Sequence, residues 1–321
     1  MRETVFIKNN IDKWQAYESG LKENRSFSAD EISEMYLQVT EDLSYARTFY
    51  PASKITSYLN NLAVQVHQLI YKNKKERTDR FKKFWFRELP GLFYDARKEI
   101  RLSLIIFLLS ILIGVVSSAN DDSFVRLIMG DAYVNMTEAN INKDDPMAVY
   151  KKMNETEMFF GITFNNLRVS FIAFAFGAIF GLGTAFILIQ NGIMLGAFQY
   201  FFYQKGLLWT SFLTIWIHGT LEISTIVIEG AAGFLIGKAL LFPKSFSRID
   251  ALKIEAKKGI KIVIGVAPII ILAGFLEGFV TRHTEFATVT KLAIILLSAT
   301  FVVFYYWLFP MKVKQEARRN G

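Results

Sequence analysis

The sequence predicts an all-α protein: a polytopic membrane helix bundle of about six spans, with a re-entrant or broken segment, joined to an N-terminal cytosolic helical bundle. Three observations carry this prediction. Hydrophobic residues make up 52% of the 321 residues and fall in long blocks, and a bilayer core needs about 20 mainly apolar residues as a helix. The net charge of +8 lies mostly beside those blocks and forms no nucleic-acid-binding motif. The lack of cysteine excludes disulfides, thiolate zinc sites and a cysteine nucleophile.

Residues 1–79 are predicted to form a cytosolic helical domain. Ser28 and Glu31 have the spacing of a capping box, in which each side chain accepts a hydrogen bond from the backbone N–H of the other residue. Apolar residues recur at helical spacing after this box and again from about residue 52 to residue 71. Pro51 separates these two helices. An earlier helix over about residues 6–21 completes the bundle.

Residues 80–101 alternate cations with aromatic side chains, a composition typical of an amphipathic helix at the lipid surface. We expect four side chains to contact lipid there: Lys82, Lys83, Trp85 and Arg87. A bend is expected at Pro90-Gly91, before the first span. The alternative is an ordinary juxtamembrane elbow whose basic residues only reflect topology.

Residues 102–309 are predicted to form the transmembrane domain. Four apolar segments are long enough to span a bilayer: 102–119, 169–189, 262–281 and 292–309. The apolar region 193–241 is too long for one span and is interrupted at residues 204–206 and at His218-Gly219. We therefore expect a short span over 193–203, a re-entrant or interfacial piece over 207–217 and a full span over 220–241. This interpretation gives six crossings.

The distribution of lysine and arginine predicts the orientation, because cytoplasmic loops retain positive charge. The loop 120–166 holds 4 Lys and Arg against 8 Asp and Glu, so we expect it to face outward. The flank before the first span, the linker 242–261 and the tail 310–321 are basic, so we expect them in the cytosol. Both termini are then cytoplasmic.

Glycines recur four residues apart in the apolar segments, which places each pair on one helix face and lets helix backbones approach closely. We interpret them as intramolecular packing positions, with a dimer interface or a mobile seam as the alternative. The pairs are Gly177 and Gly181, Gly192 and Gly196, Gly233 and Gly237, and Gly274 and Gly278.

A polar stripe is the sharpest cluster of chemically active side chains. If the segment is helical throughout, the spacing of Ser211, Thr214, His218, Glu222, Thr225 and Glu229 places them on one face. Glu277, in a later span, is the natural additional member. Ionisable groups at membrane depth are expensive, so we expect these side chains to face protein or water. The expected supporting polar residues are Asn165, Asn166, Arg168, Gln190 and Asn191.

Several motifs resemble the stage II sporulation protein M family. They are Ile11 to Trp14, Asp42 to Arg47, Tyr58 to Asn60, His67, Asn165-Asn166, Gln190 to Gly196, and His218 to Glu222. Ile217 stands where many members have proline. The resemblance covers almost the whole chain and implies a multi-pass protein of the bacterial inner membrane. In spore formers, members hold peptidoglycan-degrading proteins at the engulfing septum, and no catalytic residues are carried over to this chain.

Three functions compete for the stripe. A non-enzymatic scaffold would use His218 and Glu222 to satisfy broken backbone, and we expect this function, with lipid and other envelope membrane proteins as partners and no nucleic acid. A proton- or ion-coupled transporter or channel would use Glu222, Glu229 and Glu277 as proton or cation sites. A zinc hydrolase at His218 and Glu222 is the third function, disfavoured because no second histidine lies near. We expect no cofactor and no metal, and a homodimer is an open alternative.

Overall fold

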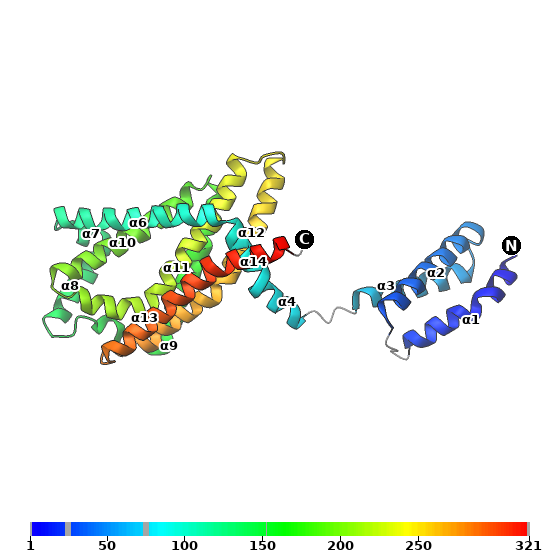
Figure 1. Cartoon of the computed structure of the whole chain (residues 1–321), viewed down its shortest axis with the longest axis horizontal. Coiled ribbons are helices and arrows are strands. Elements are labelled where there is room, and N and C mark those ends of the chain that lie inside the picture. Colours follow the sequence, from blue (N-terminus) through cyan, green and yellow to red (C-terminus); the bar gives the residue numbers. More distant parts are fainter. Residues whose placement is uncertain (1, 23–26, 73–76, 152, 320–321) are drawn as a thin grey trace. The chain divides into compact units, whose positions relative to one another are not determined.

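The computed structural model describes residues 2–22, 27–72, 77–151 and 153–319. The chain divides into two compact units, Met1–Phe81 and Lys82–Gly321, which we call the N-terminal unit and the membrane unit. Every regular element in the described ranges is helical, which confirms the predicted all-α fold (Figure 1).

The N-terminal unit contains the three predicted helices, α1 (Glu3–Lys22), α2 (Ala29–Phe49) and α3 (Lys54–Lys72). The predicted capping box begins α2, since the Glu31 N–H donates to Ser28 Oγ and the Ser28 N–H donates to Glu31 Oε2. Fully buried Trp14 donates its indole N–H to Asp42 Oδ2 at 2.8 Å. This unit therefore has a core of its own. The helix α4 (Arg77–Lys83) contains the boundary between the two units.

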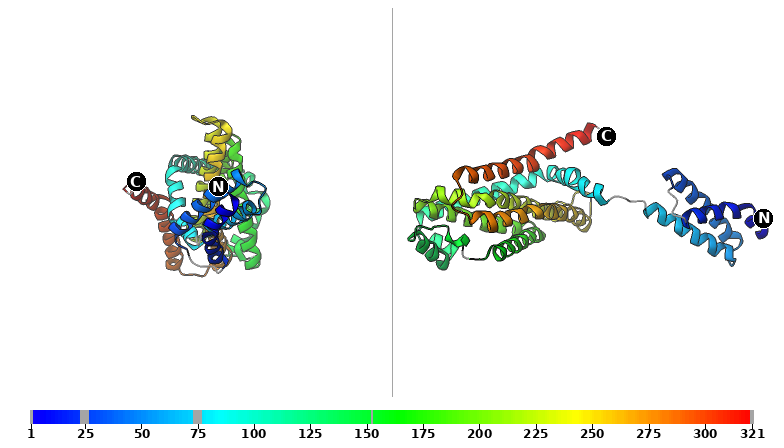
Figure 2. Two further views of the ribbon diagram at one scale, coloured as in Figure 1. Left: turned by 90° about the vertical axis from the view of Figure 1, so that its right-hand side faces the viewer. Right: turned by 90° about the horizontal axis from the view of Figure 1, so that it is seen from below.

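The membrane unit contains six helices long and apolar enough to cross a bilayer, as the sequence predicts. They lie alongside one another in the right-hand view of Figure 2. The spans are α6 (Arg97–Asn120), α9 (Glu155–Ala175) with the 3₁₀ turn η3 (Phe176–Ala178), α10 (Leu182–Gln204), α11 (Leu208–Leu241), α12 (Arg248–Phe275) with the π-helix η4 (Leu276–Thr281), and α13 (Thr288–Val303) with η5 (Phe304–Leu308) and α14 (Phe309–Arg319).

Two of the predicted spans, 169–189 and 193–203, do not correspond to single helices of the structure. The predicted span 169–189 crosses a tight turn between α9 and α10, where Phe180 and Gly181 have φ of 51° and 82°. Hydropathy does not detect this turn because its residues are as apolar as the spans. The predicted short span 193–203 is the second half of α10, a continuous helix of 23 residues.

The predicted re-entrant piece 207–217 is also wrong, because α11 runs unbroken through His218-Gly219 from Leu208 to Leu241. Hydroxyl groups in this segment bond within the helix, with Thr214 donating to the Thr210 carbonyl and Thr220 to the Trp216 carbonyl. In its most apolar 18-residue stretch 67% of residues are buried, against 22–44% in the other spans. The helix that carries the polar stripe is therefore the central helix of the bundle.

The basic-aromatic segment packs one side on the protein, and its contact with lipid stays a prediction. It forms η1 (Phe84–Glu88) and α5 (Leu89–Asp95), and the chain turns at Ala96 rather than at Pro90-Gly91. Leu89 and Phe93 are buried in the core, and Tyr305 donates to the Trp85 carbonyl at 2.9 Å. The cations expected at the lipid, Lys82, Lys83 and Arg87, are exposed, whereas Trp85 packs against the core.

The two long connections are more ordered than predicted. The expected linker 242–261 is mostly helix, because α12 begins at Arg248. The expected outer loop contains α7 (Phe124–Met129), α8 (Asp131–Ile141) and η2 (Ala148–Lys151), and these pack a small core against the end of α10. Glu138 holds this layer in place through ion pairs with Arg126 and with Lys205. Together α7, α8 and η2 form a layer over the adjoining ends of the spans, which we call the cap.

The predicted glycine pairs pack within the chain. A Cβ atom on Gly177 would overlap the Gly233 carbonyl, and one on Gly196 would overlap the Ile111 carbonyl. Neighbouring spans also lie against the remaining pair members: Gly181 against Phe234 and Gly237, Gly192 against Phe107 and Ser110, Gly274 against Thr163, and Gly278 against Phe159. Gly181 lies in the turn and not in a span, and its left-handed backbone suits glycine.

Candidate functional site

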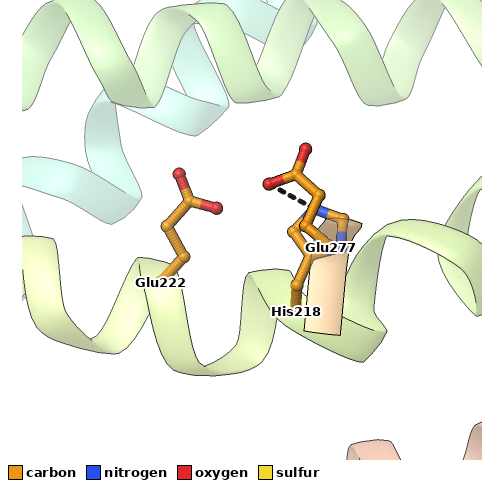
Figure 3. Close-up of side chains that lie close together, drawn as sticks. All are labelled: His218, Glu222 and Glu277. Carbon is orange, nitrogen blue, oxygen red and sulfur yellow. Dashed lines mark ion pairs between the residues drawn. The ribbon is translucent and has the colours of Figure 1, made fainter. Parts of the chain in front are cut away.

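The site begins with two side chains on α11. His218 and Glu222 are four residues apart, so they project from one helix face, one turn apart (Figure 3). His218 is only 4% exposed, and its neighbour Gly219 adds no side chain on that turn. Two polar groups thus enter the interior from the central helix.

The π-helix η4 supplies the opposing groups. Glu277 Oε2 lies 3.8 Å from His218 Nε2, and Thr281 Oγ1 shares a 2.9 Å hydrogen bond with His218 Nδ1. Both nitrogens of the ring therefore face residues of η4. Ligand atoms of His218, Glu222 and Glu277 all lie within 4.8 Å of one another. π-Helical turns occur frequently at functional sites, and this one places a carboxylate and a hydroxyl against one imidazole.

These three side chains line a cavity of about 560 Å³, which we call the polar cavity. Most of the lining is apolar, so a few polar groups converge in an otherwise hydrophobic space, as in small-molecule and ion sites. The polar lining residues are Tyr133, Tyr150, Asn165, Asn166, Asn191, His218, Glu222 and Glu277. Among the described residues, no lysine or arginine lines the cavity, so no cationic side chain there balances the charge of its carboxylates.

The cap contributes two phenols to the polar cavity. Tyr150 lies 6.0 Å from His218, measured between ring centroids. Burial raises the pKa of Tyr150 well above its ordinary value, and the nearby Glu277 carboxylate adds to the rise. Burial also raises the pKa of Tyr133. Both phenols are therefore protonated at neutral pH and available as hydrogen-bond donors.

The structure brings together some of the predicted supporting residues and not others. Asn165, Asn166 and Asn191 line the polar cavity, and the Asn166 amide faces the Glu222 carboxylate. Arg168 and Gln190 are exposed and do not line it. The motif at 165–166 therefore contributes to the site, whereas the two flanking polar residues do not.

The stripe continues beyond the polar cavity into a closely packed region. Thr225 donates to the Glu222 carbonyl at 2.8 Å, and Glu229 is 2% exposed. Three buried polar atoms here make no hydrogen bond of 3.5 Å or less among the described residues: Glu229 Oε1, Ser170 Oγ and Tyr306 Oη. Glu229 nevertheless faces Ser170, and Tyr306 faces Ser224. Glu229 lies close enough to Glu222 and to Tyr306 to interact electrostatically with each of them.

Tyr306 connects this region to a second space at the opposite end of the spans. It lines a cavity of about 270 Å³, the arginine cavity, together with Arg97 and Arg101 at the start of α6. The sequence did not single out Tyr306, Thr281, Tyr133 or Tyr150. None of these four residues belongs to α11, so the helical periodicity of the stripe could not predict that they contribute to the site.

Comparison with known families gives two matches. Residues 103–282 match the stage II sporulation protein M family, and residues 4–72 match a domain of unknown function, DUF8413. The first match begins within the first span and ends after the fifth, and it contains every ionisable residue of the stripe. Searches of curated proteins and of solved structures returned no match.

Proposed function

Because the chain belongs to the stage II sporulation protein M family and is a multi-pass membrane protein, we propose that its membrane unit binds a cation in the polar cavity and couples that binding to transport. The observation that carries this proposal is the convergence of His218, Glu222 and Glu277 on one cavity inside the bundle. Ionisable residues among spanning helices are costly and mark ion pathways by default. This convergence favours transport over the scaffold that the sequence led us to expect.

The inner part of the stripe supports a path for protons or cations. Glu229 interacts electrostatically with both Glu222 and Tyr306, and Tyr306 borders the arginine cavity. Buried polar atoms without partners usually bind ordered water or change partners during function. Glu229 Oε1, Ser170 Oγ and Tyr306 Oη are such atoms. The proposed path therefore runs from Glu222 through Glu229 to Tyr306.

Flux through purified protein tests this function. Full-length protein is reconstituted in liposomes that contain a pH-sensitive dye, and proton movement is followed under a potassium diffusion potential. We expect Glu222→Gln to reduce the flux at least tenfold, because it removes the charge at the cavity and keeps the side-chain volume. The matched control is Glu285→Gln, which changes an exposed glutamate outside the polar cavity. Flux no greater than in empty liposomes, or equal in Glu222→Gln and wild type, would exclude transport of protons.

A scaffold that positions envelope proteins is the second candidate, and the N-terminal unit favours it. This unit folds around its own core and exposes large apolar side chains, including Leu37 and Phe49, each 58% exposed. A photo-reactive amino acid at Leu37 would then crosslink in cells to one envelope protein, whereas the same group at exposed Lys8 would not. A homodimer predicts instead a crosslink to a second copy of this chain. Equal labelling from both positions would contradict the scaffold.

A further inference from the structure

We propose that His218, Glu222 and Glu277 bind one divalent transition-metal ion, with Thr281 positioning the imidazole. This inference deepens the proposed function, because it names the class of cation that the polar cavity takes. The ligand atoms of the three residues lie within 4.8 Å of one another. A tetrahedral ion with bonds of about 2.0–2.1 Å holds its ligands ~3.3 Å apart, so modest rotations of the two carboxylates complete the site.

The histidine is already arranged as a metal ligand. Its Nδ1 shares a hydrogen bond with Thr281 Oγ1 at 2.9 Å. Metal-binding histidines almost always bond through their other nitrogen in this way, which fixes the ring and its tautomer. With Nδ1 as the donor, the lone pair of Nε2 points toward Glu277, 3.8 Å away.

The position of the second ring nitrogen is a further observation in favour of a ligand. His218 is 4% exposed and lines the polar cavity, and its only ion-pair partner among the described residues is Glu277, whose Oε2 lies 3.8 Å from Nε2. That distance is longer than a hydrogen bond, so Nε2 is free to bind a ligand from the cavity. Because Nε2 borders a cavity and lies beside a carboxylate, a cation is the partner that satisfies both groups.

Charge balance points to a divalent ion. Glu222 and Glu277 together can carry two negative charges, and the described residues that line the polar cavity include no lysine or arginine. Two carboxylates at membrane depth without a counter-ion are strongly disfavoured. A dication neutralises both. Glu277 is the third member of the cluster, and Glu229 lies outside it.

The donor set selects the class of metal. Imidazole suits zinc and iron, whereas carboxylate oxygens also suit manganese. One imidazole with two carboxylates therefore fits a first-row divalent ion better than calcium or magnesium, which prefer oxygen ligands alone. With three protein ligands, the cavity leaves a further coordination position open for water or another small ligand.

Metal content of the purified protein tests the inference. Full-length protein in lipid nanodiscs is stripped with chelator, exposed to Zn²⁺ or Mn²⁺, freed of excess metal and measured by mass spectrometry. We expect one Zn²⁺ per chain in wild type, and at least a tenfold loss of affinity in His218→Gln and in Glu277→Gln. The matched control is His283→Ala, which removes a histidine that also pairs with a glutamate, with Nδ1 2.9 Å from Glu285 Oε1, and should bind as wild type does.

Thr281→Val separates a positioning role from a merely structural one. It keeps the side-chain volume and removes the hydrogen bond to Nδ1, so zinc affinity should fall about 10-fold. The thermal midpoint of the metal-free variant should match that of metal-free wild type. The EPR spectrum of bound Mn²⁺ should also change, which a general loss of stability would not produce. This variant also keeps the test informative if His218→Gln does not fold.

Two results would overturn the inference: less than a tenth of a zinc or manganese ion per wild-type chain, or the same stoichiometry and affinity in His218→Gln and Glu277→Gln as in wild type. The proposed function fails separately. Stoichiometric zinc without flux of protons or metal would support this inference and exclude transport. Glu222-dependent proton flux in metal-free protein, without stoichiometric binding, would support transport and overturn the metal site.

Discussion

Along α11, His218 and Glu222 lie on the same face as Thr225 and Glu229, yet the two pairs have different surroundings. The first pair, the cavity half of the stripe, borders a space of about 560 Å³. The second pair, the dry half, is closely packed: Glu229 is 2% exposed, and the next residue, Gly230, lies against Ser103 of α6 and Leu188 of α10. Equal spacing in one helix therefore produces a potential ligand site at one end and tightly packed polar groups at the other.

The glycines of α11 explain this difference. In the dry half, a Cβ on Gly233 would overlap Thr184 and the Ala173 carbonyl, so the neighbouring backbones are in contact there. In the cavity half, a Cβ on Gly219 would meet only Ile215 and Ile223 of its own helix, at 3.6 and 3.8 Å. Close approach of neighbouring helices near Gly233 leaves no cavity around Glu229. No neighbouring helix approaches Gly219 closely, so a cavity remains around His218.

The largest expected effect comes from filling each half. Gly233→Val should destabilise the membrane unit by about 3 kcal/mol, because the new side chain displaces packed backbone. Gly219→Val should change stability much less, since its methyl groups extend into the polar cavity, and it should reduce cation binding. Thermal unfolding of the two purified variants measures the difference. Equal destabilisation would contradict the proposed distinction between the halves.

A smaller effect is expected when each carboxylate is replaced by an apolar side chain of similar length. Glu229→Met should stabilise the protein by about 1 kcal/mol, because it removes a buried oxygen without a partner. Glu222→Met should leave stability nearly unchanged, since its carboxylate borders open space. Both should abolish flux if the proposed path is correct. Denaturation in mixed detergent micelles provides the stability comparison, and destabilisation by Glu229→Met would show that its carboxylate is satisfied.

The smallest expected effect is that of Tyr306→Phe at the end of the dry half. Its hydroxyl is buried without a partner among the described residues, so its removal should change stability by less than ~1 kcal/mol. Proton flux should nevertheless fall, because the variant breaks the connection between Glu229 and the arginine cavity. Flux at the wild-type rate would exclude Tyr306 from the path and confine the functional groups to the cavity half.

The sequence predicts the composition of this site better than its geometry. Composition and hydropathy predict an all-α bundle with six spans because lipid requires long apolar helices. The periodicity along α11 also predicts one face for His218, Glu222 and Glu229, and the structure confirms that this segment is a single helix. The expected re-entrant piece is wrong because a glycine beside a histidine does not by itself break a helix, and α11 keeps its own backbone hydrogen bonds through His218-Gly219.

What the sequence could not predict comes from contacts between elements. The turn at Phe180-Gly181 is apolar, so its left-handed backbone leaves no trace in hydropathy. The π-helix η4 that brings Thr281 to His218 has no signature in the local sequence. Tyr150 reaches the polar cavity from the cap, about 70 residues before His218, a separation that no local pattern records.

Cysteine accessibility tests the difference between the two halves most directly, since the chain contains no natural cysteine. Gly219→Cys and Ile228→Cys place one thiol in the cavity half and one in the dry half, where Ile228 is 2% exposed. In lipid nanodiscs, we predict that a small charged thiol reagent labels Gly219→Cys at least 10-fold faster than Ile228→Cys, and that Zn²⁺ slows the first reaction only. Equal labelling rates, or no reaction at Gly219→Cys, would contradict the proposal that the polar cavity is an accessible ion-binding site.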